Sequence, residues 1–315
     1  MEYTTPEPLA SELYSYAFIV DGLRMNDPNN IMMIRDVASI TSVFIIKGDK
    51  GDLYSVNDVP HGTVARRWYN SPTLKENRRI TIYTPPGYEN SNQSYPVFYL
   101  LHGSGGDEEA WIALGRTSQI MDNLIAQGKA KPMIVVMTNG HTQNNASPDE
   151  TNRSYTPAMG GGPREAVASM EDSFGDVMKF IETNYRVKKG KANRAIAGLS
   201  MGGMHSANIS AQYPNTFDYI GVFSAPPIAA MMGAALPSAE AESEFIPKLE
   251  TQKKNGYQLY WIACGTTDFV YKGVIDSMQK MDEIGFDYTY RESGGGHTWD
   301  NWRIYLSEFA PMLFR

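Results

Sequence analysis

The most informative part of the sequence is residues 194–213, RAIAGLSMGGMHSANISAQY. The apolar run at 195–197 predicts a buried strand, and the residues from 204 onward predict a helix. Between them stands the pattern G-x-S-x-G, centred on Ser200. A serine between a strand and a helix lies in a tight, strained turn, and glycines two positions to either side let the backbones approach closely. Such a nucleophile elbow exposes the hydroxyl and directs the first N–H groups of the helix toward it. An ordinary glycine-rich turn is the alternative.

The chain around this segment alternates short β-rich runs with helical stretches from about Arg78 to the C-terminus. Several of the runs are continuously apolar, as strands buried on both faces are. This pattern predicts the α/β class, with a mostly parallel central sheet flanked by helices. The expected strands are 80–84, 97–101, 133–137, 194–197, 219–223, 259–263 and 288–290, and the expected helices are 119–127, 164–185, 204–213, 273–284 and 301–310. Two longer segments, 139–163 and 226–247, are expected to be loops.

Residues 1–60 do not join this alternation. The segment around Asp21-Gly22 reads as strand, turn, strand, and Asp-Gly is a hairpin signal. We therefore expect a small antiparallel β segment at 1–60 and a larger α/β domain at 61–315. About 60 residues are marginal for an independent core, so the apolar face of the segment is expected to dock on the larger domain. That face carries three side chains, Tyr16, Phe18 and Val20.

Composition excludes several classes of protein. The 315 residues include 28 lysines and arginines against 35 aspartates and glutamates, a formal net charge of −7 that repels phosphate backbones. Nucleic acid is therefore not an expected partner. The apolar runs fall far short of the roughly 20 residues that span a bilayer, so no membrane span is expected, and residues 1–6 show no signal-peptide pattern. The single cysteine, Cys264, excludes an intrachain disulfide and is expected to be a buried thiol.

A serine nucleophile requires a base, and the sequence offers five histidines. His205 lies little more than one helical turn after Ser200, where its ring is expected to point into packing or solvent. Three others stand in loops before Ser200 and are interpreted as loop histidines without a catalytic role: His61, His102 and His141. His297 follows the glycine-rich loop 293–296 after the last expected strand, so it is the expected general base.

An acid that orients the base is expected between the serine and the histidine in chain order. Asp268 follows an expected strand by one turn, so it emerges at the edge of the sheet where Ser200 also lies. Buried against the imidazole N–H of His297, it would fix the tautomer and stabilise the imidazolium. An ordinary turn aspartate is the alternative. Three other aspartates are expected on a solvated helix face or at the opposite end of the sheet: Asp276, Asp282 and Asp287.

Residues 100–106, LLHGSGG, follow the second core strand. The glycines beside Ser104 let its N–H face the site next to that of Met201, so these two residues are the expected oxyanion donors. A glycine-rich turn is the alternative, whereas a phosphate loop is not supported, because G-x-x-x-x-G-K-[ST] does not occur. Metal chemistry lacks support too, since neither H-x-x-x-H nor clustered carboxylates are present, and no cofactor is expected.

An aromatic acyl group needs a flat apolar slot beside the nucleophile. Trp111 follows the oxyanion loop and Trp299 follows His297. Both tryptophans are therefore expected in the wall of a substrate pocket, together with Gly103. A position in the core is the alternative for each tryptophan.

Four segments together resemble the esterase D-like α/β-hydrolases, closest to bacterial feruloyl esterases of carbohydrate esterase family 1. They are 101–108 (LHGSGGDE), 198–203 (GLSMGG), 265–268 (GTTD) and 296–299 (GHTW), and they occur in family order within residues 62–315. The resemblance implies the α/β-hydrolase fold. Carried over residue by residue, it implies that Ser200 is the nucleophile, Asp268 the orienting acid and His297 the base. It also implies that Ser104 and Met201 are the oxyanion donors.

The resemblance implies a serine carboxylesterase that cleaves feruloyl esters of plant cell-wall polysaccharide through an acyl-enzyme, with feruloylated arabinoxylan or oligosaccharide as partner and a periplasmic or secreted location. Relatives with this core include acetylxylan esterases and S-formylglutathione hydrolases, so an acetyl ester or a thioester is the alternative substrate. A non-catalytic glycan-binding protein on a hydrolase fold is the alternative from another class. Residues 1–60 look like the last strands of an early-set β-sandwich similar to the family 48 carbohydrate-binding module.

Overall fold

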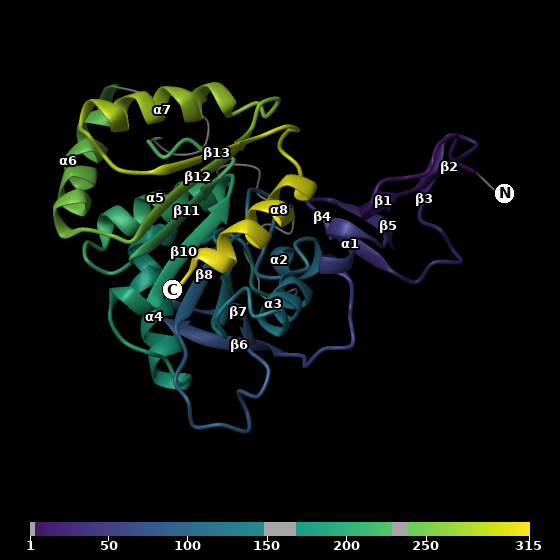
Figure 1. The fold of residues 1–315 in the computed structure, drawn as a ribbon, viewed down its shortest axis with the longest axis horizontal. Helices are drawn as coiled ribbons and strands as arrows, with labels where there is room; N and C mark the ends of the chain where they lie inside the picture. Colours follow the sequence, from purple (N-terminus) through teal and green to yellow (C-terminus); the bar gives the residue numbers. More distant parts are fainter. Residues whose placement is uncertain (1–3, 148–167, 229–238) are drawn as a thin grey trace.

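The computed structural model describes residues 4–147, 168–228 and 239–315. Its largest element is an eight-stranded sheet with the strand order β13-β12-β11-β10-β8-β9-β7-β6 (Figure 1). Strands β8 to β13 are parallel, whereas β7 and β6 continue the sheet antiparallel at one edge. The bounds are β6 Thr63–Ser71, β7 Glu76–Thr84, β8 Val97–Leu101, β9 Ile134–Thr138, β10 Arg194–Leu199, β11 Tyr219–Phe223, β12 Leu259–Gly265 and β13 Thr289–Ser293.

Helices cover both faces of this sheet (Figure 1). Within β8, Tyr99 belongs to one core cluster, and Phe98 and Leu100 belong to the other. Consecutive side chains therefore face opposite helix layers, which is why the strands are continuously apolar. Helices α4 (Met170–Asn184), α5 (Met201–Gln212), α6 (Ala239–Asn255) and α7 (Tyr271–Glu283) pack in the first cluster, and α2 (Ala110–Ala113), α3 (Thr117–Ala126) and α8 (Trp299–Phe309) in the second. In the described ranges, none of the helices combines the length and the apolar composition that crossing a membrane requires.

The sheet between two helix layers confirms the predicted α/β-hydrolase architecture, and two longer elements differ from the prediction. Strand β6 was not expected, because exposed polar residues such as Arg66 and Arg67 interrupt its apolar pattern. Helix α6 runs through Pro247, where the sequence predicted a loop. Proline usually disfavours a helix interior, so the prediction was wrong at this position. Residues 148–163 and 229–238 of the two expected loops, and the start of the helix expected at 164–185, lie outside the described residues.

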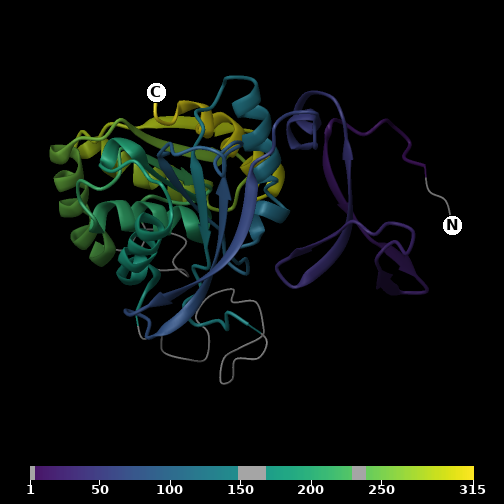
Figure 2. The same cartoon turned by 90° about the horizontal axis from the view of Figure 1, so that it is seen from below.

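The N-terminal segment forms separate small antiparallel sheets (Figure 2). The hairpin predicted at Asp21-Gly22 is confirmed, since both residues have positive φ angles, 52° and 81°, between β2 and β3. Strand β5 pairs with both β1 and β4. The bounds are β1 Glu12–Tyr16, β2 Phe18–Val20, β3 Leu23–Met25, β4 Met33–Asp36, β5 Ser39–Ile46 and α1 Asp49–Tyr54.

This segment docks on the larger domain, but not through the predicted face. Leu13 and Tyr54 are buried in the core cluster that also contains α8. The guanidinium of Arg303 on α8 donates to the Glu12 carboxylate at 2.8 Å, and Arg116 donates to the carbonyl of Tyr54 at 3.0 Å. Contacts between buried side chains and paired charges thus join the two parts.

The predicted docking face is covered within the segment instead. The ring of Tyr16 lies 5.9 Å from that of Phe18 and 5.5 Å from that of Phe44 on β5. Strands β2 and β3 lie at the end of the segment far from the central sheet (Figure 1). Packing inside the segment therefore leaves Tyr16, Phe18 and Val20 half-buried without help from the larger domain.

Candidate active site

Ser200 occupies the turn between β10 and α5. Its backbone angles, φ 52° and ψ −120°, are seldom adopted by residues with a side chain. A Cβ atom added to Gly198 would lie 2.4 Å from the Gly202 carbonyl oxygen, and one added to Gly202 would lie 2.4 Å from the Leu101 carbonyl oxygen. Only glycine fits at both positions, so the strained turn that the sequence predicts around Ser200 is present.

Asp268 and His297 form a hydrogen-bonded pair. The Nδ1 atom of His297 lies 2.9 Å from Oδ1 and 3.0 Å from Oδ2 of Asp268, whose side chain is fully buried. A carboxylate accepts hydrogen bonds, so the proton of the neutral imidazole sits on Nδ1 and Nε2 is left as the acceptor. Oδ1 of Asp268 also accepts the N–H of Val270 at 3.1 Å, which fixes the carboxylate at the start of α7.

The loop that carries His297 is held on both sides. The N–H of Thr267 donates to the Gly295 carbonyl at 3.1 Å, joining the loop after β13 to the turn that carries Asp268. The side-chain amide of Asn301 on α8 donates to the Gly296 carbonyl at 2.9 Å. These bonds position the imidazole, and the sequence analysis did not single out Asn301.

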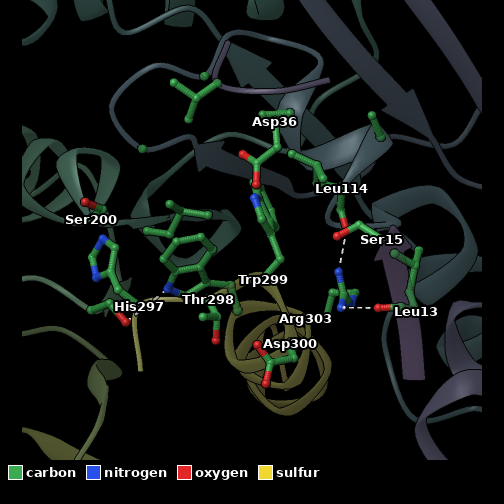
Figure 3. A pocket seen from close by; sticks show the side chains of 18 of the residues that line it. Leu13, Ser15, Asp36, Leu114, Ser200, His297, Thr298, Trp299, Asp300 and Arg303 are labelled. Atoms are coloured by element: carbon green, nitrogen blue, oxygen red, sulfur yellow. Dashed lines mark hydrogen bonds between the residues drawn. The ribbon is translucent and has the colours of Figure 1, made fainter. Parts of the chain in front are cut away.

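Ser200 and His297 line one cavity of about 1210 Å³. Figure 3 shows the imidazole ring facing the serine side chain. The glycine-rich loop after β8 contributes Gly103 and Ser104 to the same cavity as Ser200. The structure therefore brings together the three residues that the sequence analysis placed in a catalytic triad.

The comparisons with known proteins give the family of the chain. Residues 71–313 match the family model described as putative esterase. The chain belongs to this esterase family. It is 29% identical over 318 residues to an endo-1,4-beta-xylanase/feruloyl esterase of Xylanibacter ruminicola; the match covers 99% of this chain and 40% of that protein, so the chain spans less than half of its relative.

Solved structures are also similar to this chain. A ferulic acid esterase has a TM-score of 0.65 at 25% identity, covering 81% of this chain and 98% of that chain. A CE1 ferulic acid esterase from Anaeromyces mucronatus, in complex with ferulic acid, has a TM-score of 0.64 at 22% identity and covers 82% and 93% of the two chains. At 22% identity, the second match shows that the two chains share a fold.

The predicted oxyanion loop, residues 102–106, packs tightly on the elbow. A Cβ atom on Gly103 would lie 2.5 Å from Cδ1 of Leu199 and 3.2 Å from Cβ of Ser200, so a side chain there would have to displace Leu199. Met201 is the first residue of α5, where backbone N–H groups lack partners within the helix. Ser104 thus stands in the loop that packs on the elbow, and Met201 directly follows Ser200.

Aromatic rings line part of the cavity. Trp299 is half-buried and lines the cavity, and Phe269 is 76% exposed with its ring centroid 4.4 Å from that of His297. Trp302 also packs edge-on against the imidazole, with the ring centroids 5.0 Å apart. The sequence analysis named Trp299 but not Phe269, although Phe269 directly follows the predicted acid.

Trp111 does not reach the cavity, so its expected place in the pocket wall is corrected. It is 1% exposed, and its indole N–H donates to the Leu101 carbonyl at 2.8 Å. Its ring lies 5.3 Å from that of Trp299, which it supports from behind. Trp111 is a core residue, the alternative given above, because its indole N–H has a hydrogen-bond partner inside the protein.

The N-terminal segment also lines the cavity, which the sequence analysis missed. Asp36 at the end of β4 accepts a hydrogen bond from the side chain of Trp299, and burial raises the pKa of its carboxyl (Figure 3). Arg35 forms an ion pair with Asp107 in the loop after β8. No sequence pattern marks these residues, because they reach the site only through docking of the segment.

Two further histidines form hydrogen bonds with carboxylates outside the cavity. His61 Nδ1 lies 3.0 Å from the Asp122 carboxylate, and His205 Nδ1 lies 2.6 Å from the Glu171 carboxylate. The ring of His205 thus points away from Ser200 into packing, as the sequence predicts for this helix position.

Proposed function

We propose that the protein is a serine carboxylesterase that hydrolyses feruloyl esters of plant cell-wall polysaccharide through an acyl-enzyme. The observation that supports it most strongly is the strained Ser200 elbow facing the His297–Asp268 pair in one cavity. The names of the relatives, an endo-1,4-beta-xylanase/feruloyl esterase and ferulic acid esterases, support the substrate class.

In the proposed reaction the Ser200 hydroxyl attacks the ester carbonyl while Nε2 of His297 takes its proton. The carbonyl oxygen becomes an oxyanion, which the N–H groups of Ser104 and Met201 stabilise. His297 then gives its proton to the departing sugar oxygen, leaving the acyl group on Ser200. A water molecule then gives a proton to His297 and attacks the carbonyl of the acyl-enzyme; the bond to Ser200 breaks, the acid is released, and His297 returns the proton to the Ser200 oxygen. Asp268 keeps the imidazole in the required tautomer throughout.

The aromatic wall favours a hydroxycinnamoyl group over the alternatives. An exposed ring such as Phe269 beside the catalytic imidazole offers a stacking surface to a planar acid. An acetyl group needs only a small closed pocket, whereas this cavity has about 1210 Å³. The strained conformation of Ser200 argues against a non-catalytic glycan-binding protein, because binding a glycan does not require that strain.

The substrate class is tested with a side-by-side panel of esters. Methyl ferulate and feruloylated arabinose are expected to be cleaved with higher kcat/KM than acetylated xylan or S-formylglutathione. If acetylated xylan or the thioester gives the highest kcat/KM, the feruloyl assignment is wrong while the triad remains.

Trp299→Ala is expected to lower kcat/KM for methyl ferulate about tenfold and for 4-nitrophenyl acetate much less, because only the larger acid contacts the indole. Trp68→Ala is the matched control, since Trp68 is half exposed on β6 and does not line the cavity. Equal losses for the two esters would remove Trp299 from the acyl site.

A polysaccharide substrate is too large to enter a cell, so the proposal places the enzyme in the periplasm or outside the cell. The division into residues 1–60 and 61–315 belongs to the same proposal. The likeness of residues 1–60 to a family 48 carbohydrate-binding module stays a prediction.

A further inference from the structure

Two buried histidines, His102 and His141, form hydrogen bonds with the backbone of the predicted oxyanion loop. They are 2% and 8% exposed, and their ring centroids lie 5.5 Å apart. Neither is among the described residues that line the catalytic cavity. The sequence analysis interpreted both as loop histidines without a catalytic role, and the structure shows that both rings form hydrogen bonds with backbone groups.

The hydrogen bonds of His102 fix its proton. The N–H of Gly140 donates to Nε2 at 2.9 Å, so Nε2 carries no proton. The proton is therefore on Nδ1, which donates to the Gly103 carbonyl at 2.7 Å. Burial lowers the pKa of His102 to about 4, which keeps the ring neutral at pH 7.

His141 accepts in the same way. The N–H of Gly105 donates to its Nε2 at 3.1 Å, so this ring too is neutral with its proton on Nδ1. Burial, together with the nearby positive charge of Arg78 and neighbouring histidines, lowers the pKa of His141 to about 3. If Nε2 of His141 were protonated, it and the Gly105 N–H would both be donors, and no acceptor would lie between them.

The backbone of His141 is fixed independently of its ring. Arg78 on β7, 1% exposed, donates to the His141 carbonyl at 2.9 Å. The His141 N–H donates to the side-chain oxygen of Asn139 at 2.9 Å, and the Asn139 amide donates to Glu108 at 3.2 Å. The ring therefore extends from a rigid base, which is what a positioning group requires.

The hydrogen bonds of the two peptide groups beside Ser104 set the direction of the Ser104 N–H. In a trans peptide the carbonyl and the N–H point to opposite sides. The Gly103 carbonyl is directed at His102 and at the Gly106 N–H, 3.1 Å away, so the N–H of Ser104 in the same peptide points away from His102. The bond from Gly105 to His141 holds the next peptide and prevents the pair from rotating together.

We propose that His141 is a positioning residue, whose neutral Nε2 locks the peptide between Ser104 and Gly105 so that the Ser104 N–H stays directed at the carbonyl group attacked by Ser200. This inference rests on the proposed function, because the proposed ester hydrolysis is what forms an oxyanion next to the Ser104 N–H. A loop free to rotate would aim a carbonyl oxygen at the oxyanion instead of an N–H.

The test compares His141→Gln with His141→Asn. The oxygen of glutamine can reach the position of Nε2, whereas asparagine is equally polar but too short. We expect His141→Asn to lower kcat for 4-nitrophenyl acetate about 10- to 100-fold with KM changed less than about threefold, and His141→Gln to retain most of the wild-type kcat. Equal losses in both variants, or an unchanged kcat in His141→Asn, would overturn the proposal.

A measurement on the wild-type protein covers the case in which a variant does not fold. Nitrogen-15 NMR of the imidazoles at pH 7 should show His141 neutral with its proton on Nδ1. An imidazolium, or a proton on Nε2, would overturn the proposal.

The outcomes also separate this inference from the proposed function. A wild-type enzyme that cleaves 4-nitrophenyl acetate but not methyl ferulate would refute the feruloyl assignment and leave the His141 comparison intact. A protein inactive on both esters would refute the esterase proposal, and with it a role for His141 in catalysis.

Discussion

Ser200→Ala is expected to lower kcat for methyl ferulate by about 10³-fold or more, which corresponds to a loss of roughly 4 kcal/mol of transition-state stabilisation. The nucleophilic oxygen is lost, whereas the backbone turn around it is kept by Gly198 and Gly202. The melting temperature should therefore change little. His297→Ala should have an effect of the same order, because the hydroxyl then has no base.

Two matched variants control for the substitutions themselves. Ser210→Ala removes a hydroxyl on the same helix that bonds only to the Ala207 carbonyl among the contacts seen. His61→Ala removes a loop histidine that pairs with Asp122. Both should keep wild-type kcat. If Ser200→Ala keeps more than about a tenth of the activity, the nucleophile is assigned to the wrong residue.

Asp268→Asn is expected to lower kcat by about 10²- to 10⁴-fold. An asparagine can turn its NH₂ group toward Nδ1 of His297, and the imidazole proton then moves to Nε2. In that tautomer Nε2 cannot take the proton of Ser200. The kcat of the purified variant on methyl ferulate measures this effect.

Asp276→Asn is the control for this change, because it makes the same replacement on α7, where Asp276 pairs with Lys272 away from the cavity. It should leave kcat unchanged. A near-normal kcat for Asp268→Asn would show that Asp268 does not orient the imidazole, and the hydrogen bond at 2.9 Å would then be structural only.

The sequence was sufficient to place the three triad residues because each follows a strand of the parallel sheet. Ser200 follows β10, Asp268 follows β12 and His297 follows β13, and the carboxyl ends of parallel strands share one edge. Topology alone therefore brings them together, whatever the details of packing.

Features that depend on packing could not be predicted in the same way. Trp111 and Trp299 stand in equivalent places after catalytic loops, yet one is buried against the Leu101 carbonyl and the other lines the cavity. Asp36 reaches Trp299 only because Leu13 and Tyr54 dock the N-terminal segment. Neither outcome leaves a periodic or motif signal in the sequence.

The central claim, that Ser200 is an activated nucleophile, is tested most directly by labelling with a fluorophosphonate probe and locating the adduct by peptide mass spectrometry. The probe reacts with a serine only where a base and an oxyanion site activate it. We expect a single adduct on Ser200 in the wild-type protein and none in Ser200→Ala, with labelling strongly slowed in His297→Ala. Absence of an adduct, or an adduct on a different residue, would contradict the account.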